Sequence, residues 1–180
     1  CLNYSNHNFI IGNNMTSNNG VSIYLEYSSN NTIIENSLTN NNDSIGFLSS
    51  SNNTVSTNHI ANSTNGVVLS VSTRNTLSEN EIADNNNAGI MLDRSFYNNV
   101  TENNVTDNGY GIELITYSEN NTFYHNNLIS NAQQVYYNYQ SISTNSWDDG
   151  YPSGGNYWSD YTNRYPNATE IDASGIWNTP

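Results

Sequence analysis

Residues 51–60 read SNNTVSTNHI and contain the pattern that decides the fold, two asparagines five positions apart at Asn53 and Asn58. The same pair returns along the chain at a spacing of 22 to 23 residues. Six copies are present: Asn8/Asn13, Asn31/Asn36, Asn53/Asn58, Asn75/Asn80, Asn98/Asn103 and Asn121/Asn126. A fixed period of this length is typical of a repeat protein, in which each repeat is one structural unit that stacks on the next.

Apolar residues keep the same period. The position two residues after each asparagine is apolar, in one column Ile10, Ile33, Val55, Leu77, Val100 and Phe123, and in the other Met15, Leu38, Ile60, Ile82, Val105 and Leu128. Short runs with period two, broken by Asn, Gly and Ser, indicate strands rather than amphipathic helices. We therefore predict an all-β fold, a right-handed single-stranded parallel β-helix of about six coils, because parallel crossover connections are overwhelmingly right-handed.

The second asparagine of each pair is predicted to form a ladder along the coils. Coils that stack about 4.8 Å apart place identical amides above one another, where each amide can donate to one neighbour and accept from the other. An asparagine at a corner also tolerates the left-handed backbone conformation that a sharp bend requires, so we expect that conformation at the ladder residues. The ladder comprises Asn13, Asn36, Asn58, Asn80, Asn103 and Asn126, and a serine column comprises Ser28, Ser50, Ser72, Ser95 and Ser118.

The composition restricts the partners. The chain of 180 residues carries a formal net charge of −13, and its only three basic residues besides histidine are arginines. Nucleic acids and anionic membrane surfaces are therefore excluded as partners, because both need basic residues against phosphate. No apolar run is long enough to predict a transmembrane span. Cations, neutral glycans and proteins remain as partners, and the scarcity of basic residues is typical of exported surface proteins.

Sequons of the form Asn-X-Ser/Thr are frequent. The candidate glycosylation sites are Asn30, Asn42, Asn52, Asn62, Asn99 and Asn120. Because Asn, Ser and Thr are all abundant in this chain, a similar number of sequons would arise by chance. The sequence therefore permits glycosylation without demonstrating it.

Two regions are predicted, β-helix repeats over residues 1–135 and an irregular, aromatic-rich C-terminal cap over residues 136–180. The cap supplies the carbohydrate-binding candidates Trp147, Tyr151, Tyr157 and Trp158, whose rings could equally pack over the end of the apolar core. The first coil has no preceding cap. An uncapped coil exposes backbone groups that can pair, so we expect further coils of a longer chain or end-to-end self-association.

The repeat at residues 51–60 and the segment GGNYWSDY at residues 154–161 resemble the NosD-like β-helix family. This resemblance implies carbohydrate-binding and sugar-hydrolysis repeats of the kind abundant in surface proteins of methanogenic archaea. Relatives often carry a calcium-binding, Asp-Gly-rich C-terminal run, of which this chain keeps Asp172, Gly175 and Thr179-Pro180 but few acidic residues. The family name implies copper handling, which needs clustered soft or imidazole ligands. No such cluster is expected, since His7, His59, His125, Met15 and Met91 are spread over the repeats.

Acidic residues form the candidate catalytic group. Glu79, Glu102 and His125 precede the second asparagine in successive repeats and should stack on one outer face, with His59 and Glu81 beside them. Carboxylates on neighbouring coils would lie about 5 Å apart, near the separation in retaining glycosidases. The alternatives are a solvated acidic face without activity or a face where loosely held calcium bridges carboxylates. No other cofactor and no structural metal site is expected.

Three functions follow from these observations. The first is a secreted or cell-surface structural module, such as an envelope, S-layer-associated or filament subunit, that contacts glycans or partner proteins. The second is a polysaccharide-binding or polysaccharide-cleaving domain that uses Glu79, Glu102 and nearby aromatic rings. The third is a periplasmic-type copper-handling protein. The predicted location is extracellular or at the cell surface.

Overall fold

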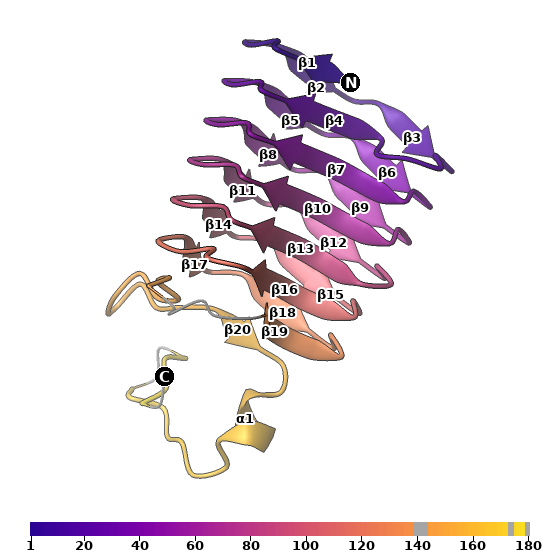
Figure 1. Cartoon of the computed structure of the whole chain (residues 1–180). Coiled ribbons are helices and arrows are strands. Elements are labelled where there is room, and N and C mark those ends of the chain that lie inside the picture. The colour runs from indigo at the N-terminus through magenta and orange to yellow at the C-terminus, as the bar shows by residue number, and fades with distance from the viewer. Residues whose placement is uncertain (139–143, 173–174, 179–180) are drawn as a thin grey trace.

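The computed structural model describes residues 1–138, 144–172 and 175–178 and shows a parallel β-helix (Figure 1). Three parallel sheets run along its length, and neighbouring strands in each sheet come from successive coils. The first sheet contains β1 (Leu2–Asn3), β4 (Ile23–Glu26), β7 (Asp43–Leu48), β10 (Asn65–Ser70), β13 (Ala88–Asp93), β16 (Tyr110–Ile115) and β19 (Gln133–Asn138). The second contains β2 (Phe9–Ile11), β5 (Thr32–Ile34), β8 (Thr54–Ser56), β11 (Thr76–Ser78), β14 (Asn99–Thr101) and β17 (Thr122–Tyr124). The third contains β3 (Asn14–Thr16), β6 (Ser37–Thr39), β9 (His59–Ala61), β12 (Glu81–Ala83), β15 (Asn104–Thr106), β18 (Asn127–Ile129) and β20 (Tyr157–Trp158).

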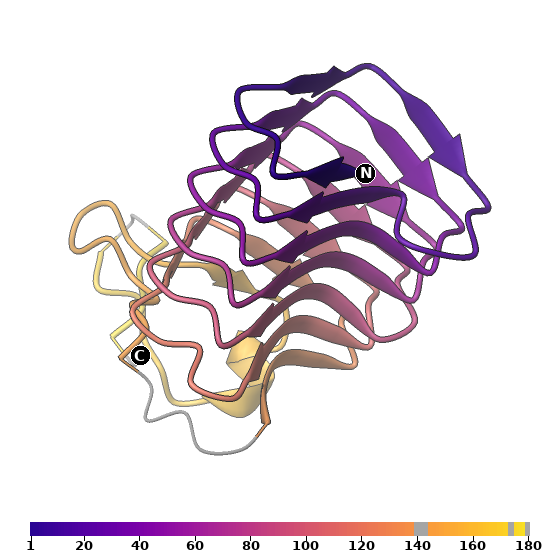
Figure 2. The same ribbon diagram turned by 45° about the horizontal axis from the view of Figure 1, so that its top comes forward.

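Each coil uses one strand of each sheet, and the register follows the sequence period. Ile33 lies beside Val55, which lies beside Leu77 in the next coil. The described coils contain no helix; α1 (Tyr161–Arg164) belongs to the C-terminal tail. The predicted parallel β-helix is confirmed. Figure 2 shows the coils in one stack, with the tail at the end opposite the N-terminus.

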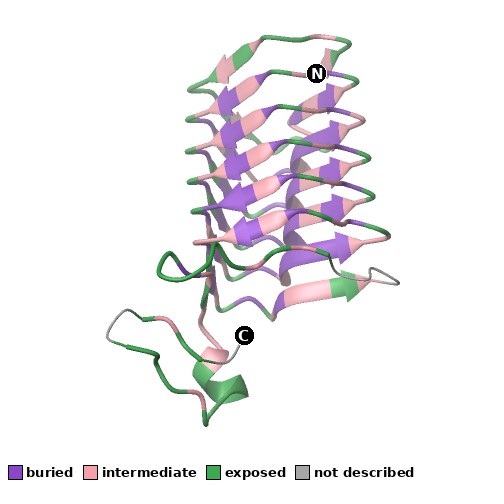
Figure 3. Ribbon diagram, turned by 90° about the vertical axis from the view of Figure 1, so that its left-hand side faces the viewer, coloured by how far each residue is buried: buried purple, intermediate pink, exposed green. Residues whose placement is uncertain are grey.

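The core is narrow and consists of columns of apolar side chains between the sheets. Figure 3 shows buried residues along the strands of successive coils. Leu38, Ile60 and Ile82 stack in one column of the third sheet and are fully buried. Burial of each such side chain contributes about 1.5–3 kcal/mol. Most coils add one apolar side chain to each such column, so a low overall hydrophobic content of 34% is enough for this fold.

The backbone turns at the residue that precedes each ladder position. Glu35, Thr57 and Glu79 have φ values of 57°, 51° and 56°, whereas the ladder asparagines that follow them do not have positive φ. The expectation that the ladder residues themselves take the left-handed conformation is therefore wrong. The physical reason is that two adjacent residues have separate roles. An exposed residue makes the bend, and the next residue points its side chain inward, where it hydrogen-bonds to the neighbouring coil.

The inward asparagines bond the coils together. The Asn36 backbone N–H and its side-chain amide both donate to Asn58 Oδ1, at 2.9 and 3.0 Å. The Asn36 amide also donates to the Ile10 carbonyl of the preceding coil at 2.9 Å. The first asparagine of each pair forms an equivalent ladder, and the sequence analysis missed a third at Asn18, Asn41, Ser63, Asn85, Asn108 and Asn131. The third ladder is marked in the sequence by its spacing, because each of its residues lies five positions after the second asparagine of a pair.

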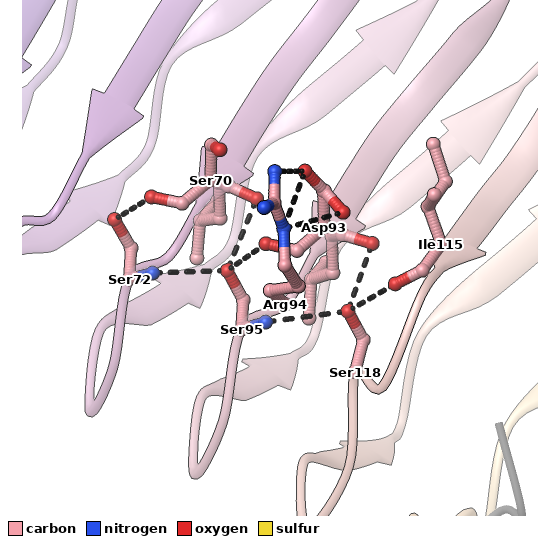
Figure 4. A network of polar contacts seen from close by, with 9 residues as sticks. Ser70, Ser72, Asp93, Arg94, Ser95, Ile115 and Ser118 are labelled. Atoms are coloured by element: carbon pink, nitrogen blue, oxygen red, sulfur yellow. Dashed lines mark hydrogen bonds and ion pairs between the residues drawn. The ribbon is translucent and has the colours of Figure 1, made fainter.

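The serine column forms the ladder of the fourth corner (Figure 4). The backbone N–H of Ser72 donates to Ser95 Oγ at 3.1 Å, and that of Ser95 donates to Ser118 Oγ at 3.3 Å. Arg94 makes the bend before Ser95 and pairs outside the coil with Asp93 at 2.8 Å. In the described residues the corners of successive coils are thus joined by hydrogen-bonded side chains.

Two ladders extend beyond residue 135, where the sequence analysis expected the repeat to end. Asn121 donates to Asn145 Oδ1, and Asn126 donates to Asn156 Oδ1. Asn145 and Asn156 are eleven residues apart instead of five, because the loop 148–155 is inserted between them. The segment 144–159 is therefore a partial seventh coil, and the insertion hid its period in the sequence.

Candidate functional site

A cleft of about 880 Å³ lies between the last coil and the C-terminal tail. Residues at the end of the β-helix contribute one part of its lining, including Val135, Tyr137, Trp147 and Trp158. The tail contributes the other part, including Tyr161, Tyr165, Ile176 and Trp177. The volume and the mixture of rings with a few polar groups are typical of a ligand-binding pocket.

Trp147 and Trp158 are held in place by the core. The Trp147 ring stacks on Phe123, with ring centroids 4.4 Å apart, and continues the apolar column of the second sheet. Trp158 lies in register with Leu128 and has its ring centroid 5.8 Å from that of Trp147. Both indoles cover the end of the apolar core, so part of their surface is used for packing and the remainder lines the cleft.

Other rings at the cleft are more accessible. Tyr157 is 57% exposed, Tyr137 is 43% exposed and Trp177 is 39% exposed. The Tyr161 ring lies 5.5 Å from that of Trp177. Of the predicted carbohydrate-binding residues, Tyr157 therefore has an accessible ring at the cleft, whereas Tyr151 does not line it and donates its hydroxyl to Asp172 at 2.8 Å. Tyr137 and Trp177 have no sequence signal that links them to this cleft, because only the fold brings them to one place.

The inserted loop 148–155 forms part of the cleft and is attached to the sixth coil. His125 Nε2 lies 3.0 Å from the Ser153 carbonyl oxygen and 3.1 Å from Ser153 Oγ. Ser153 Oγ donates to Asp149 Oδ2 at 2.9 Å. A carbonyl oxygen only accepts, so the proton of the neutral imidazole lies on Nε2 and this nitrogen cannot activate Ser153 as a nucleophile. The arrangement is an anchor for the loop rather than a catalytic triad.

The charges at the cleft are mainly negative. Asp148 and Asp160 line it together with a single arginine, Arg164. Arg164 Nε lies 3.2 Å from Asp160 Oδ2, within the turn of α1. The only cationic side chain among the described lining residues is thus already paired with a carboxylate.

The acidic face predicted from the sequence is exposed and does not contribute to the cleft. Glu79 and Glu102 both make bends at the second corner, with φ values of 56° and 59°, and their side chains face solvent. His125 occupies the next position but is bonded to the inserted loop. His59 Nδ1 pairs with Glu81 Oε2 at 2.8 Å, again on the surface. The catalytic role of Glu79, Glu102 and His125 stays a prediction.

The candidate glycosylation sites occupy different environments. Asn30, Asn52 and Asn120 are exposed at the first corner, and Asn62 is exposed at the third corner. Asn42 is also exposed, but the hydroxyl of its sequon partner Ser44 is buried and bonded to Ser63 Oγ at 2.9 Å. Asn99 has a buried amide oxygen, and Thr101 of its sequon is 7% exposed. The structure thus leaves Asn30, Asn52, Asn62 and Asn120 as the accessible candidates.

The described residues do not gather a set of metal ligands. No group of three or more His, Cys, Asp or Glu side chains in residues 1–138, 144–172 and 175–178 could hold a metal ion. Met15 packs against the core, and His59 and His125 have the partners given above. Of the calcium-type C-terminal run, Asp172 bonds Tyr151, and Thr179-Pro180 lie outside the described residues. In the described part of the chain the His, Cys, Asp and Glu side chains do not come together as a copper centre would require, and calcium binding stays a prediction.

The fold and the cleft define a class of protein, a parallel β-helix with an aromatic-lined site at its C-terminal end. The chain belongs to the NosD family, whose model, described as periplasmic copper-binding protein (NosD), matches residues 1–163. No curated protein matches the chain. None of the helical segments in the described part of the chain has the length and apolar character needed to cross a bilayer.

A solved structure shares the architecture. The chain is similar to a double mutant of the periplasmic alginate epimerase AlgG, with 27% identity and a TM-score of 0.70 over 74% of this chain. The match covers 33% of the epimerase, so the chain corresponds to about a third of that enzyme. An alginate lyase from Paenibacillus sp. str. FPU-7 matches 84% of this chain and 78% of its own, with 12% identity and a TM-score of 0.33. A score that low supports no argument about this chain.

Proposed function

We propose that the chain is a periplasmic or extracellular β-helix module that binds a polysaccharide in its C-terminal cleft. The coils act as a rigid structural support, and the partial seventh coil with its tail forms the binding site. The observation that supports this proposal best is the cleft of about 880 Å³ with accessible Tyr137, Tyr157 and Trp177 rings. Aromatic faces offer large, rigid apolar surfaces against which the C–H faces of sugar rings can pack.

The comparisons support the location and the ligand class. The family description and the similar epimerase are both periplasmic, and the epimerase acts on a polysaccharide. The finer possibilities, an envelope, S-layer or filament subunit at the cell surface, agree with the regular coils and with exposed sequons on their corners. In each of these settings the module would hold a glycan chain at one end of a stiff rod.

Binding to a panel of soluble polysaccharides, measured by affinity electrophoresis, tests the proposal. The double variant Tyr157→Ala/Trp177→Ala removes two accessible rings, and we expect it to weaken binding by about tenfold or more, since each aromatic contact is worth about 0.5–1.5 kcal/mol beyond the area that it buries. The matched control is Tyr4→Ala, which removes a ring that is 72% exposed on the first coil. Equal binding by the cleft variant and the parent would refute the site.

Catalysis is the second candidate function, because the similar solved structure is an enzyme. The residues to test are Glu79 and Glu102, which stand on neighbouring coils, and Asp148 and Asp160 at the cleft. We expect no release of reducing ends from any polysaccharide that binds. Release by the parent that is lost in Glu79→Gln/Glu102→Gln would show that the exposed face, and not the cleft, is the functional site.

A further inference from the structure

We propose that the polysaccharide bound in the cleft is uncharged, and that the cleft discriminates against polyuronates such as alginate. This inference rests on the proposed function and names the substrate class of the same site. A preference for uncharged polysaccharides would distinguish this chain from the similar epimerase, whose name refers to alginate.

Among its described lining residues the cleft offers a uronate a single cation, Arg164, which already pairs with a carboxylate of the same cleft. Asp148 and Asp160 line the cleft, and the Arg164 guanidinium that accompanies them is held by Asp160 at 3.2 Å. Asp148 accepts the backbone N–H of Gly150, so its carboxylate is fixed at the entrance to the inserted loop. Recognition of a carboxylate normally uses an arginine fork or another cation. A uronate entering here would instead face two carboxylates.

The charge on the rest of the molecule also disfavours binding of a polyuronate. The formal net charge is −13, and the other two arginines lie on the coils. Arg94 pairs with Asp93 at 2.8 Å, and Arg74 lies 5.5 Å from the centroid of the Tyr97 ring. Exposed charges act over a screening length of about 8 Å in physiological salt, and a cleft lined by one sign of charge concentrates the field. A polyanion is therefore repelled both at a distance and in the cleft.

An uncharged sugar chain suits the same groups. The exposed faces of Tyr137, Tyr157 and Trp177 can pack against C–H faces without any charge on the ligand. The two carboxylates can accept hydrogen bonds from sugar hydroxyls, and bonds to a charged acceptor are roughly twice as strong as neutral ones. The carboxylates that exclude a uronate thus become the orienting groups for a neutral sugar.

The test compares a neutral β-glucan, a neutral mannan and alginate, each at low and at physiological ionic strength in the presence of a calcium chelator. We expect at least one neutral polysaccharide to bind at least about tenfold more tightly than alginate at low salt, because repulsion is largest where screening is weakest. Added salt should reduce the difference in affinity between the neutral polysaccharide and alginate. The variant Asp148→Asn/Asp160→Asn should reduce that difference further, since the substitution removes both carboxylates and releases Arg164.

A matched control separates the cleft from the overall charge. Asp84→Asn/Asp107→Asn makes the same change in net charge at two exposed bends of the third corner, where Asn tolerates the observed φ of 54°. This control should leave the preference for neutral chains almost unchanged. Alginate binding as tight as that of the neutral chains, or alginate binding that weakens as salt is added, would overturn the inference while upholding a glycan site. If none of the three polysaccharides binds, the proposed function fails and the inference fails with it.

Discussion

Asn80 and Asn103 share two hydrogen bonds across neighbouring coils: the Asn80 side-chain amide donates to Asn103 Oδ1 at 2.9 Å, and the Asn80 backbone N–H donates to the same oxygen at 3.1 Å. The Asn80 amide also donates to the Val55 carbonyl at 3.0 Å, and Asn80 Oδ1 accepts from the Asn58 amide at 2.9 Å. One buried side chain therefore bonds three successive coils.

Asn80→Ala should lower the free energy of unfolding by about 3 kcal/mol, because it leaves the Asn58 N–H and the Val55 carbonyl buried without their partner. Thermal or urea unfolding followed by circular dichroism measures the loss. The control Asn86→Ala removes an exposed amide from the same coil and should change stability by less than about 0.5 kcal/mol. Equal effects of the two changes would show that the ladder contributes little.

Gly66→Ala should prevent the coils from stacking normally. A Cβ at Gly66 would clash with the Gly89 carbonyl oxygen and would lie 2.8 Å from Ile82 Cγ2, and the backbone of the next coil cannot move away cheaply. We expect the free energy of unfolding to fall by more than about 3 kcal/mol, a loss comparable to those of other severe packing defects. Gly20→Ala is the control, since nothing lies within 4 Å of its added Cβ. A Gly66→Ala protein as stable as the parent would contradict this close approach.

Glu113 should make stability depend on pH. It is 5% exposed on the outer side of β16, in register with Met91 and Tyr136, and burial raises its pKa although a hydrogen bond from Asn87 opposes the rise. A carboxyl whose pKa is raised in the folded state binds more protons there than in the unfolded chain, so this group stabilises the fold at low pH and the contribution is lost as pH rises through the folded pKa.

Glu113→Gln should therefore raise the free energy of unfolding at neutral pH, on the order of 1 kcal/mol, and the gain should vanish below the ordinary pKa of glutamate, where the parent carboxyl is protonated in both states. Unfolding curves over a pH series measure both limits. The half-buried Glu26→Gln makes the same chemical change in the same sheet and serves as the comparison. A constant difference across the series would mean that Glu113 is not destabilised by its burial.

End-to-end association is the fourth prediction. β1, β2 and β3 are edge strands of the three sheets, and Phe9 and Ile11 of β2 are 72% and 50% exposed. Edge strands with unpaired peptide groups template further pairing. Light scattering over a concentration series should show a rising mass for the chain of residues 1–180, and Ile11→Lys should reduce the rise by placing charge on the edge strand. A strictly monodisperse monomer at high concentration would refute the prediction.

The regular part of the molecule was predictable because its energetics repeat. Leu38 and Ile60 occupy equivalent positions in consecutive coils, and both face inward because burial of an apolar side chain is favourable at each. The period of apolar residues in the sequence therefore predicts which side chains are neighbours in the fold. The left-handed residue at each corner was misplaced by one position, since Glu79 and Asn80 are adjacent and either could in principle make the bend. The third ladder was missed because Ser63 interrupts its run of asparagines.

The sequence by itself determined that the chain is a β-helix, its six regular coils, the alkyl columns and the ladder of the second asparagines, because a stacked repeat converts spacing along the chain into neighbours in space. Only the tertiary structure decided the site. Tyr137, Tyr157 and Trp177 come from three segments without a common period, and they meet because an inserted loop interrupts the last coil and the tail returns to its end. Contacts of that kind depend on the three-dimensional path of the chain, which no local pattern encodes.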